Sequence, residues 1–291
     1  MNENLISLAN LSPEEFRKWQ LKLLDILVYF RDFCIEHKLK FCIAAGTCLG
    51  AVRHKGFIPW DDDVDVIMPR KDYDRLFDLW EQYADKSKFQ CCKTTETQSC
   101  GFPMIVIRSV NTTCIYEHSK DWNICHGLKI DVEHFDAMPR GAFNQFLQNV
   151  FAKGLALFRA QRIPNQKSKS TQTLSKILLN IFSSSKVRYK ISIFCEKQIK
   201  KYNIENADYV RYLVEKPIKK EFFEELIWVD FENTTMPIPK KYHEYLSIQY
   251  GDYMQLPPVE KRKPITKCLF YDLDNSYLKY KGKYYCTNNN K

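Results

Sequence analysis

The sequence lacks the features that mark membrane-spanning and disulfide-stabilised proteins. None of its apolar runs reaches the roughly 18 residues that a helix needs to cross a bilayer, and the run at 21–35 is interrupted by charges at helical spacing. It contains no secretory signal sequence, and its eleven cysteines, an odd number, include no C-x-x-C pair. These absences predict free thiols and a cytoplasmic protein in a reducing environment.

Internal repeats, long low-complexity tracts and nucleic-acid-binding modules are also missing. The net charge of +9 therefore comes without the arrangement of basic residues that would indicate a nucleic acid partner. At 291 residues, 45% of them hydrophobic, the chain is long enough to bury a full core. We expect one large globular domain, or one domain with a helical appendage.

The hydrophobic pattern predicts an α/β (α+β) protein with a mixed sheet flanked by helices. Ser12 and Pro13 have the residue types of a helix start. A turn at Gly46 and a short helix are expected to follow the first strand. The periodicity predicts helices at 13–37, 70–84, within 140–202 and at 240–249, and strands at 40–45, 63–68, 102–110, 112–117, 127–133 and, as an extended segment, 231–239.

Four carboxylates in five positions, at Asp61, Asp62, Asp63 and Asp65, are the strongest chemical signal. Like charges this close repel one another unless a cation lies among them. On an extended strand Asp63 and Asp65 project to one face, while the valines that follow them turn into the core. The pattern predicts one half of a site for Mg²⁺ or Mn²⁺, with phosphate oxygens completing the ligand shell.

A third carboxylate is expected from the strand at 127–133. Its alternation places Lys129, Asp131 and Glu133 on one face, where Asp131 would join Asp63 and Asp65 if the two strands pair. Asp131 would then bind the metal and act as a general base; local capping or pairing is the alternative. Whether Asp61 and Asp62 bind metal directly stays open. An EF-hand is disfavoured, because its sixth and twelfth loop positions lack the required glycine and glutamate.

Phosphate contacts are expected from residues on both sides of the first turn. The backbone N–H groups of Gly46 and Thr47 can approach phosphate oxygens closely. Arg53 and His54 suit a second phosphate contact, although a structural role is the alternative for His54. Arg108, on a strand with apolar neighbours, is either a phosphate ligand or part of a buried structural ion pair.

The middle of the chain is strongly basic. Such a segment is usually a solvated helix face, but its charge could also attract anionic lipid headgroups or an acidic glycan. We expect a mobile loop or a boundary at 164–173. Between residues 159 and 203 the single acid is Glu196, against the basic residues Arg159, Arg162, Lys167, Lys169, Lys176, Lys186, Arg188, Lys190, Lys197, Lys200 and Lys201.

The segment from Gly46 to Asp65 resembles the signature of the LicD family, which includes the fukutin-related proteins. It contains Gly-Thr-x-Leu-Gly followed by Arg-His-x-Gly-Phe-Ile-Pro-Trp-Asp-Asp-Asp-x-Asp. The tail, with Pro-Ile-Pro, Tyr-Leu, Tyr-Gly-Asp-Tyr-Met and Leu-Pro-Pro, resembles the family's C-terminal motif. The resemblance extends from about residue 21 to residue 263 and is weakest in the basic middle.

The resemblance implies a nucleotidyltransferase-type fold and a metal-dependent phosphotransferase. Family members move a phosphorylated alcohol, such as phosphocholine or ribitol phosphate, from a CDP-linked donor to a sugar hydroxyl. The acceptor would be a cell-surface glycan, or a lipopolysaccharide or teichoic-acid type of precursor. Asp63 and Asp65 match the fold's Asp-x-Asp pair and Gly46-Thr47 its Gly-Ser/Thr turn, and Asp131 is assigned as the third carboxylate.

In the tail, Tyr250 and Asp252 are candidates for the donor or acceptor pocket. A turn that docks the last helix, with Gly251 between them, would need the same residue types. Many relatives have a histidine a little after this point, whereas residues 260–267 here contain none. This departure puts a catalytic role of the extreme tail in doubt.

We expect a catalytic core at 1–139, a basic helical segment at 140–203 and a C-terminal part at 204–291 that packs on the core and completes the site. One alternative function is a glycosyltransferase that holds a nucleotide sugar through Asp63 and Asp65. Such an enzyme would want a larger nucleotide-binding α/β domain before this motif, and only about 40 residues precede Gly46. The other is a non-catalytic protein that binds anionic polymers. Either enzyme would be cytoplasmic, with peripheral contact at the inner membrane face through the 159–203 segment.

Overall fold

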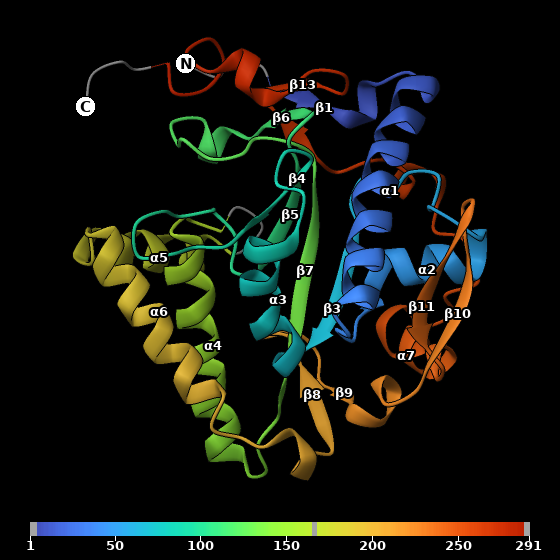
Figure 1. Ribbon diagram of the computed structural model, residues 1–291. Helices are drawn as coiled ribbons and strands as arrows, with labels where there is room; N and C mark the ends of the chain where they lie inside the picture. Colours follow the sequence, from blue (N-terminus) through green and yellow to red (C-terminus); the bar gives the residue numbers. More distant parts are fainter. Residues whose placement is uncertain (1–4, 165–167, 288–291) are drawn as a thin grey trace. The chain divides into compact units, whose positions relative to one another are not determined.

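The computed structural model describes residues 5–164 and 168–287 (Figure 1). The chain forms two compact units: a core unit, made of the chain up to residue 91, residues 106–133 and the chain from residue 222 on, and a helical unit, made of residues 92–105 and 134–221. The three segments expected from the sequence, with boundaries after residues 139 and 203, stay a prediction about domains. Each compact unit consists of segments that are separated in the sequence by segments of the other unit.

The core unit is built on a sheet in which β3 and β7 are central neighbours (Figure 1). β2 runs antiparallel to β3, with Ile43 opposite Val66. The mixed α/β class expected from the sequence is confirmed. The strand order is β2 (Cys42–Ile43), β3 (Asp65–Pro69), β7 (Lys129–Ala137), β5 (Ile105–Ser109) and β4 (Phe89–Cys92).

Four helices belong to the core unit: α1 (Pro13–Glu36), α2 (Ala45–His54), α3 (Arg70–Tyr83) and α7 (Tyr242–Tyr250). α1 begins as predicted, since the hydroxyl oxygen of Ser12 accepts a hydrogen bond from the N–H of Glu15. The prediction of a turn at Gly46 before the short helix is wrong, because α2 already begins at Ala45 and Gly46 lies in its first turn. α2 contacts β3, β10 and α7.

The tail joins the rest of the core unit through two antiparallel strand pairs and forms a third pair within itself. The sequence predicted one extended segment at 231–239, and the structure forms it as β11 of a hairpin whose first strand, β10, was not expected. The pairs are β1 (Ile6–Ser7) with β12 (Lys267–Cys268), β6 (Thr113–Ile115) with β13 (Phe270–Asp272), and β10 (Leu226–Phe231) with β11 (Thr234–Pro239).

The helical unit contains α4 (Ala142–Ala160), α5 (Lys169–Ile181) and α6 (Ser185–Ile199), which confirms the helical character predicted for 140–202. In it β7 pairs with β8 (Tyr209–Arg211), which pairs with β9 (Ile218–Lys219). α4 and α6 pack through Leu155 and Cys195, among others. No helix among the described residues is long and apolar enough to cross a membrane.

The loop expected at 164–173 is shorter than predicted. Residues 165–167, including Lys167 of the basic set, lie outside the described residues. Lys169 already belongs to α5, because the hydroxyl oxygen of Ser168 caps the helix by accepting from the N–H of Thr171 at 3.3 Å. The serine-rich sequence therefore starts a helix.

Gly50 allows α2 to approach the loop that leads to the carboxylates. A Cβ at this position would lie 2.4 Å from the carbonyl oxygen of Gly56, a backbone atom that cannot turn away. We expect Gly50→Ala to lower the free energy of unfolding by about 1–3 kcal/mol, the usual cost of overpacking. Chemical denaturation measures this, and an unchanged midpoint would show that helix and loop can separate without cost.

Candidate active site

Asp63, Asp65 and Asp131 come together in the core unit from neighbouring strands. β3 begins at Asp65, two residues after Asp63, and β7 lies beside it. The N–H of Asp131 donates to the carbonyl oxygen of Val64 at 2.9 Å. Val64 and Val66 are fully buried, and the three aspartates between and beside them are half-buried. The predicted alternation and the predicted strand pairing are both confirmed.

The three carboxylates act on one another electrostatically. Burial, followed by the negative charges of Asp63 and Asp131, holds the pKa of Asp65 well above its usual range. Burial and the charge of Asp131 raise the pKa of Asp63 to about 6, against the opposing effect of the nearby Lys129 ammonium. Such mutual shifts are typical of like charges that share one site. A cation among them would relieve the repulsion.

Asp61, whose role the sequence left open, belongs to the same cluster. Burial and the charges of Asp63 and Asp62 raise its pKa to about 8. Its Oδ2 atom is buried and has no hydrogen-bond partner among the described residues. This oxygen lies toward the start of α2, 2.9 Å from where a Cβ on Gly46 would stand. The signal in the sequence was the spacing of two residues from Asp61 to Asp63 to Asp65.

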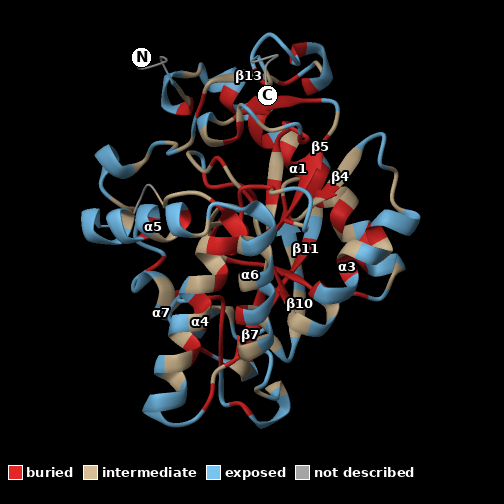
Figure 2. Cartoon of the chain, turned by 90° about the vertical axis from the view of Figure 1, so that its left-hand side faces the viewer, coloured by how far each residue is buried: buried red, intermediate tan, exposed pale blue. Residues whose placement is uncertain are grey.

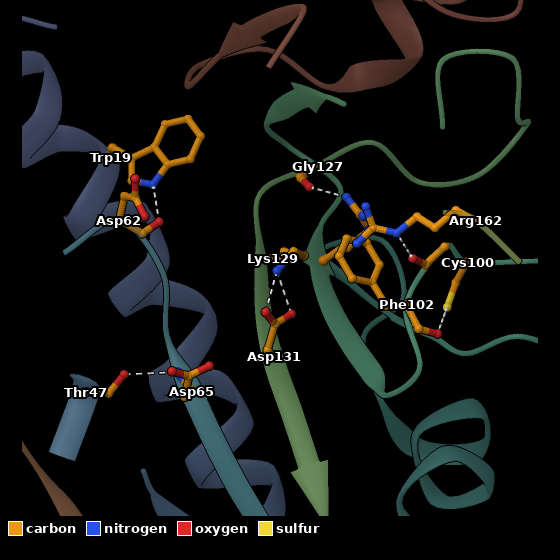
Figure 3. A network of polar contacts seen from close by, with 12 residues as sticks. Trp19, Thr47, Asp62, Asp65, Cys100, Phe102, Gly127, Lys129, Asp131 and Arg162 are labelled. Atoms are coloured by element: carbon orange, nitrogen blue, oxygen red, sulfur yellow. Dashed lines mark hydrogen bonds and ion pairs between the residues drawn. The ribbon is translucent and has the colours of Figure 1, made fainter. Parts of the chain in front are cut away.

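Asp62 points away from the cluster and holds the tail. Its buried Oδ2 atom accepts hydrogen bonds from the N–H groups of Ile265 and Thr266, both at 2.8 Å. The indole of Trp19 in α1 donates to its carbonyl oxygen at 3.0 Å (Figure 3). Asp62 therefore fixes the position of its neighbours Asp61 and Asp63 without joining them.

Lys129 supplies the positive charge nearest to the carboxylates. Its ammonium lies 2.6 Å from both oxygens of Asp131, with the two side chains 11% and 14% exposed (Figure 3). Within residues 5–164 and 168–287, no three His, Cys, Asp or Glu side chains are grouped as a ready-made metal centre. The sequence placed Lys129 on the same face as Asp131 but did not assign it to the site.

The start of α2 offers backbone donors beside the carboxylates. The N–H of Ala45 donates to the hydroxyl of Tyr245 at 2.9 Å, and the N–H of Cys48 to the carbonyl of Ala44. The N–H groups of Gly46 and Thr47 have no partner in the part of the chain that the structure describes. Free N–H groups at a helix start attract anions.

Thr47 also positions one of the carboxylates. Its hydroxyl oxygen accepts a hydrogen bond from the N–H of Asp65 at 2.9 Å, which ties the start of α2 to the start of β3 (Figure 3). The two residues of the Gly-Thr pair predicted from the sequence therefore have different roles. Gly46 has no side chain in front of the N–H groups at the helix start, and Thr47 positions Asp65 through its hydroxyl.

Arg53 and His54 lie together at the end of α2. The Nε of Arg53 donates to Nε2 of His54 at 2.9 Å, and its NH1 donates to the carbonyl of Tyr253 at 2.7 Å. Burial and the Arg53 charge lower the pKa of His54, so this ring is neutral at pH 7. Burial and the charge of Arg262 lower the pKa of Arg53, which identifies Arg262 as a neighbour that the sequence did not single out.

The two tail candidates occupy different surroundings. Burial and the negative charges of Asp65 and Asp61 raise the pKa of the Tyr250 hydroxyl, so this group lies near the cluster although 45% of the side chain is exposed. Asp252 is exposed, just after the helix end at Gly251. A role of Asp252 in substrate binding stays a prediction.

Arg108 is fully buried on β5. Its NH1 donates to the carbonyl of Gly127 at 2.8 Å, at the turn that leads into β7. Burial raises the pKa of Tyr116 and of Cys125, and the positive charge of Arg108 opposes this rise. The bond to Gly127 gives Arg108 a structural role, while the buried ion pair and the phosphate contact both stay predictions.

Fold and site define an α/β protein in which the segment from Gly46 to Asp65 carries half-buried carboxylates at a strand start, next to the N-terminus of a helix. Residues 38–125 match the family model described as LicD/FKTN/FKRP, nucleotidyltransferase domain. The chain is 31% identical over 263 residues, 85% of its length and 94% of the other's, to the lipopolysaccharide cholinephosphotransferase LicD of Haemophilus influenzae. The chain belongs to the LicD family.

Two further similarities are shorter. An uncharacterized protein of Rickettsia prowazekii is 33% identical over 81 residues, which is 26% of this chain and 30% of that protein. An uncharacterized protein of Rickettsia typhi is 33% identical over 70 residues, 23% of each chain.

The raised pKa of Asp61 makes stability depend on pH. Between the usual value of 3.8 and about 8, the folded protein binds more protons than the unfolded chain, so the free energy of unfolding falls as the pH rises through this window. We expect Asp61→Asn to remove this pH dependence. Without divalent ions, the gain in free energy of unfolding of the variant over wild type should be larger at pH 8 than at pH 5 by about 1 kcal/mol or more. If the free energy of unfolding of variant and wild type had the same pH dependence, Asp61 would not be part of the carboxylate cluster.

Lys129 should stabilise the protein in the absence of divalent ions. Lys129→Met leaves the Asp131 carboxylate beside Asp63 and Asp65 without this cation, and we expect a loss of about 1–3 kcal/mol at pH 8. The matched control is Lys88→Met, which removes an exposed pair with Asp85 at 3.3 Å and should change stability by less than about 0.5 kcal/mol. Equal effects of the two substitutions would rule out a special role of Lys129.

Proposed function

We propose that the protein is a metal-dependent phosphotransferase that moves a phosphorylated alcohol from a CDP-linked donor to a sugar hydroxyl. Phosphocholine is the first candidate, because the relative similar over most of the chain is named a lipopolysaccharide cholinephosphotransferase. The acceptor would be a lipopolysaccharide or a related cell-surface glycan precursor. The observation that carries the proposal is the grouping of Asp63, Asp65 and Asp131 beside the open N-terminus of α2.

The donor set suits Mg²⁺ or Mn²⁺. Carboxylate oxygens are the ligands these hard cations prefer. The raised pKa values of Asp63 and Asp65 reflect burial and, after it, a repulsion between carboxylates that a divalent cation would relieve. Asp131 can become a ligand once Lys129 turns away from it. When bound, the ion would neutralise charge on the donor diphosphate and on the departing CMP.

Groups of the protein itself would bind the donor phosphates and accept the proton of the sugar hydroxyl. The N–H groups of Gly46 and Thr47 would bind donor phosphate oxygens, with the helix dipole favouring negative charge there. Asp131 would accept the proton of the sugar hydroxyl as its oxygen attacks phosphorus. The new bond joins that oxygen to the phosphorus of the alcohol phosphate, and the bond from this phosphorus to the bridging oxygen of CMP breaks. Arg53 and Tyr250 stand at the edge of this space.

The proposal includes a cytoplasmic location. All eleven cysteines are free thiols, nine of them buried, and a reducing compartment preserves such thiols. The burial of most of these cysteines among apolar neighbours gives them a packing role.

Asp63→Ala and Asp65→Ala should each lower turnover with CDP-choline and a glycan acceptor by at least about 100-fold, because each removes a carboxylate of the proposed metal site. The fold should persist, since the substitutions relieve repulsion. The matched control is Asp78→Ala on the exposed side of α3, which should retain wild-type turnover. Near-normal turnover of either site variant would exclude the metal site, and turnover with a UDP-sugar alone would favour the glycosyltransferase.

A further inference from the structure

The helical unit exposes apolar side chains at helical spacing on α5. Leu174, Ile177 and Ile181 are 58%, 50% and 65% exposed, and their spacing of three and four residues places them on one face. The side chains that α5 buries are those of Ser175 and Leu179. Figure 2 shows α5 largely in the colour of exposed residues. The helix thus turns its apolar side to solvent, the reverse of an ordinary surface helix.

α4 has a similar exposed stripe near its start. Phe143, Phe146 and Val150 are 73%, 62% and 49% exposed, again three and four residues apart. Its buried residues, among them Leu155, lie on the opposite side and pack against α6. Contiguous apolar side chains on a protein surface usually mark an interaction site.

The charges on the same helices have one sign. Glu196 is the single acid from residue 140 to residue 203, and it pairs with Arg159 at 2.8 Å while only 13% exposed. The surface charge of the three helices is therefore positive. The exposed lysines are Lys153, Lys169, Lys176, Lys186, Lys190 and Lys197.

The C-terminal end of α5 is hydrogen-bonded to α6. The guanidinium of Arg188 donates to the carbonyl oxygens of Phe182 and Leu179, both at 2.6 Å. These bonds satisfy carbonyl groups at the C-terminal end of α5, which would otherwise lack partners. The apolar stripe therefore belongs to a helix whose C-terminal end is hydrogen-bonded to the first turn of α6.

We propose that the helical unit binds the surface of an anionic lipid bilayer through the apolar stripe of α5 and the exposed lysines of α5 and α6. The stripe would enter the boundary between headgroups and acyl chains, and the ammonium groups would lie over anionic headgroups. An acidic glycan would engage the lysines but leave the stripe exposed to water. A second copy of this chain would bring lysine against lysine. The inference does not depend on which group the protein transfers.

The test uses the full chain and sedimentation with vesicles of phosphatidylcholine, with and without phosphatidylglycerol. We expect binding to the anionic vesicles, and a loss of affinity of about ten-fold or more in the variant Leu174→Gln/Ile177→Gln/Ile181→Gln. Glutamine keeps both charge and helix propensity. The matched control replaces three exposed apolar residues of the core unit, Leu21, Ile35 and Leu278, by glutamine, and should bind as wild type.

A second variant, Lys176→Gln/Lys186→Gln/Lys190→Gln, should weaken binding and reduce its salt dependence. The proposal is overturned if wild type ignores anionic vesicles, if the α5 glutamine variant binds like wild type, or if only a soluble acidic polysaccharide binds. It is also overturned if wild type is a dimer that the α5 variant converts to a monomer. The vesicles contain neither donor nor acceptor, so failure here leaves the proposed transferase activity standing.

Discussion

The crowding of negative charge at the start of β3 is the constraint on which the core unit depends. Asp61, Asp63 and Asp65 stand at every second position in a half-buried setting, where burial and neighbouring carboxylates raise the pKa of all three side chains. The chain holds them there through backbone contacts: the Thr47 hydroxyl fixes the N–H of Asp65, and the backbone of β7 pairs with that of Val64. These backbone contacts keep the carboxylates together in spite of their repulsion.

The C-terminal tail positions the segment that carries the carboxylates, mainly through hydrogen bonds. Asp62 accepts two N–H groups from the tail, Tyr245 accepts the N–H that opens α2, and Arg53 donates to Tyr253. The signature segment is therefore held at its start, middle and end by residues about 200 positions further along the chain. This explains in physical terms why the two motifs, far apart in sequence, work as one unit of structure.

Local periodicity predicted what depends on neighbours in sequence. The helices at 13–37 and 70–84, the inward valines and the outward aspartates all follow from spacing alone. Asp61 and Asp62 could not be separated in this way, because what distinguishes them is a tail that reaches Asp62 across 203 positions. Lys129 was on the expected face, but its bond to Asp131 depends on a half-buried setting that no local pattern encodes.

The central claim is that the carboxylate cluster binds a metal and, through it and the start of α2, a CDP-linked donor. Calorimetric titration of the purified wild-type protein with CDP-choline, CDP-ribitol, CDP-glycerol and UDP-sugars, each with Mg²⁺ and with a chelator, tests it most directly. The account predicts heat of binding for a CDP-alcohol in the presence of Mg²⁺ and none, or far less, with the chelator. Binding that is equally tight with the chelator, or binding of UDP-sugars alone, would contradict it.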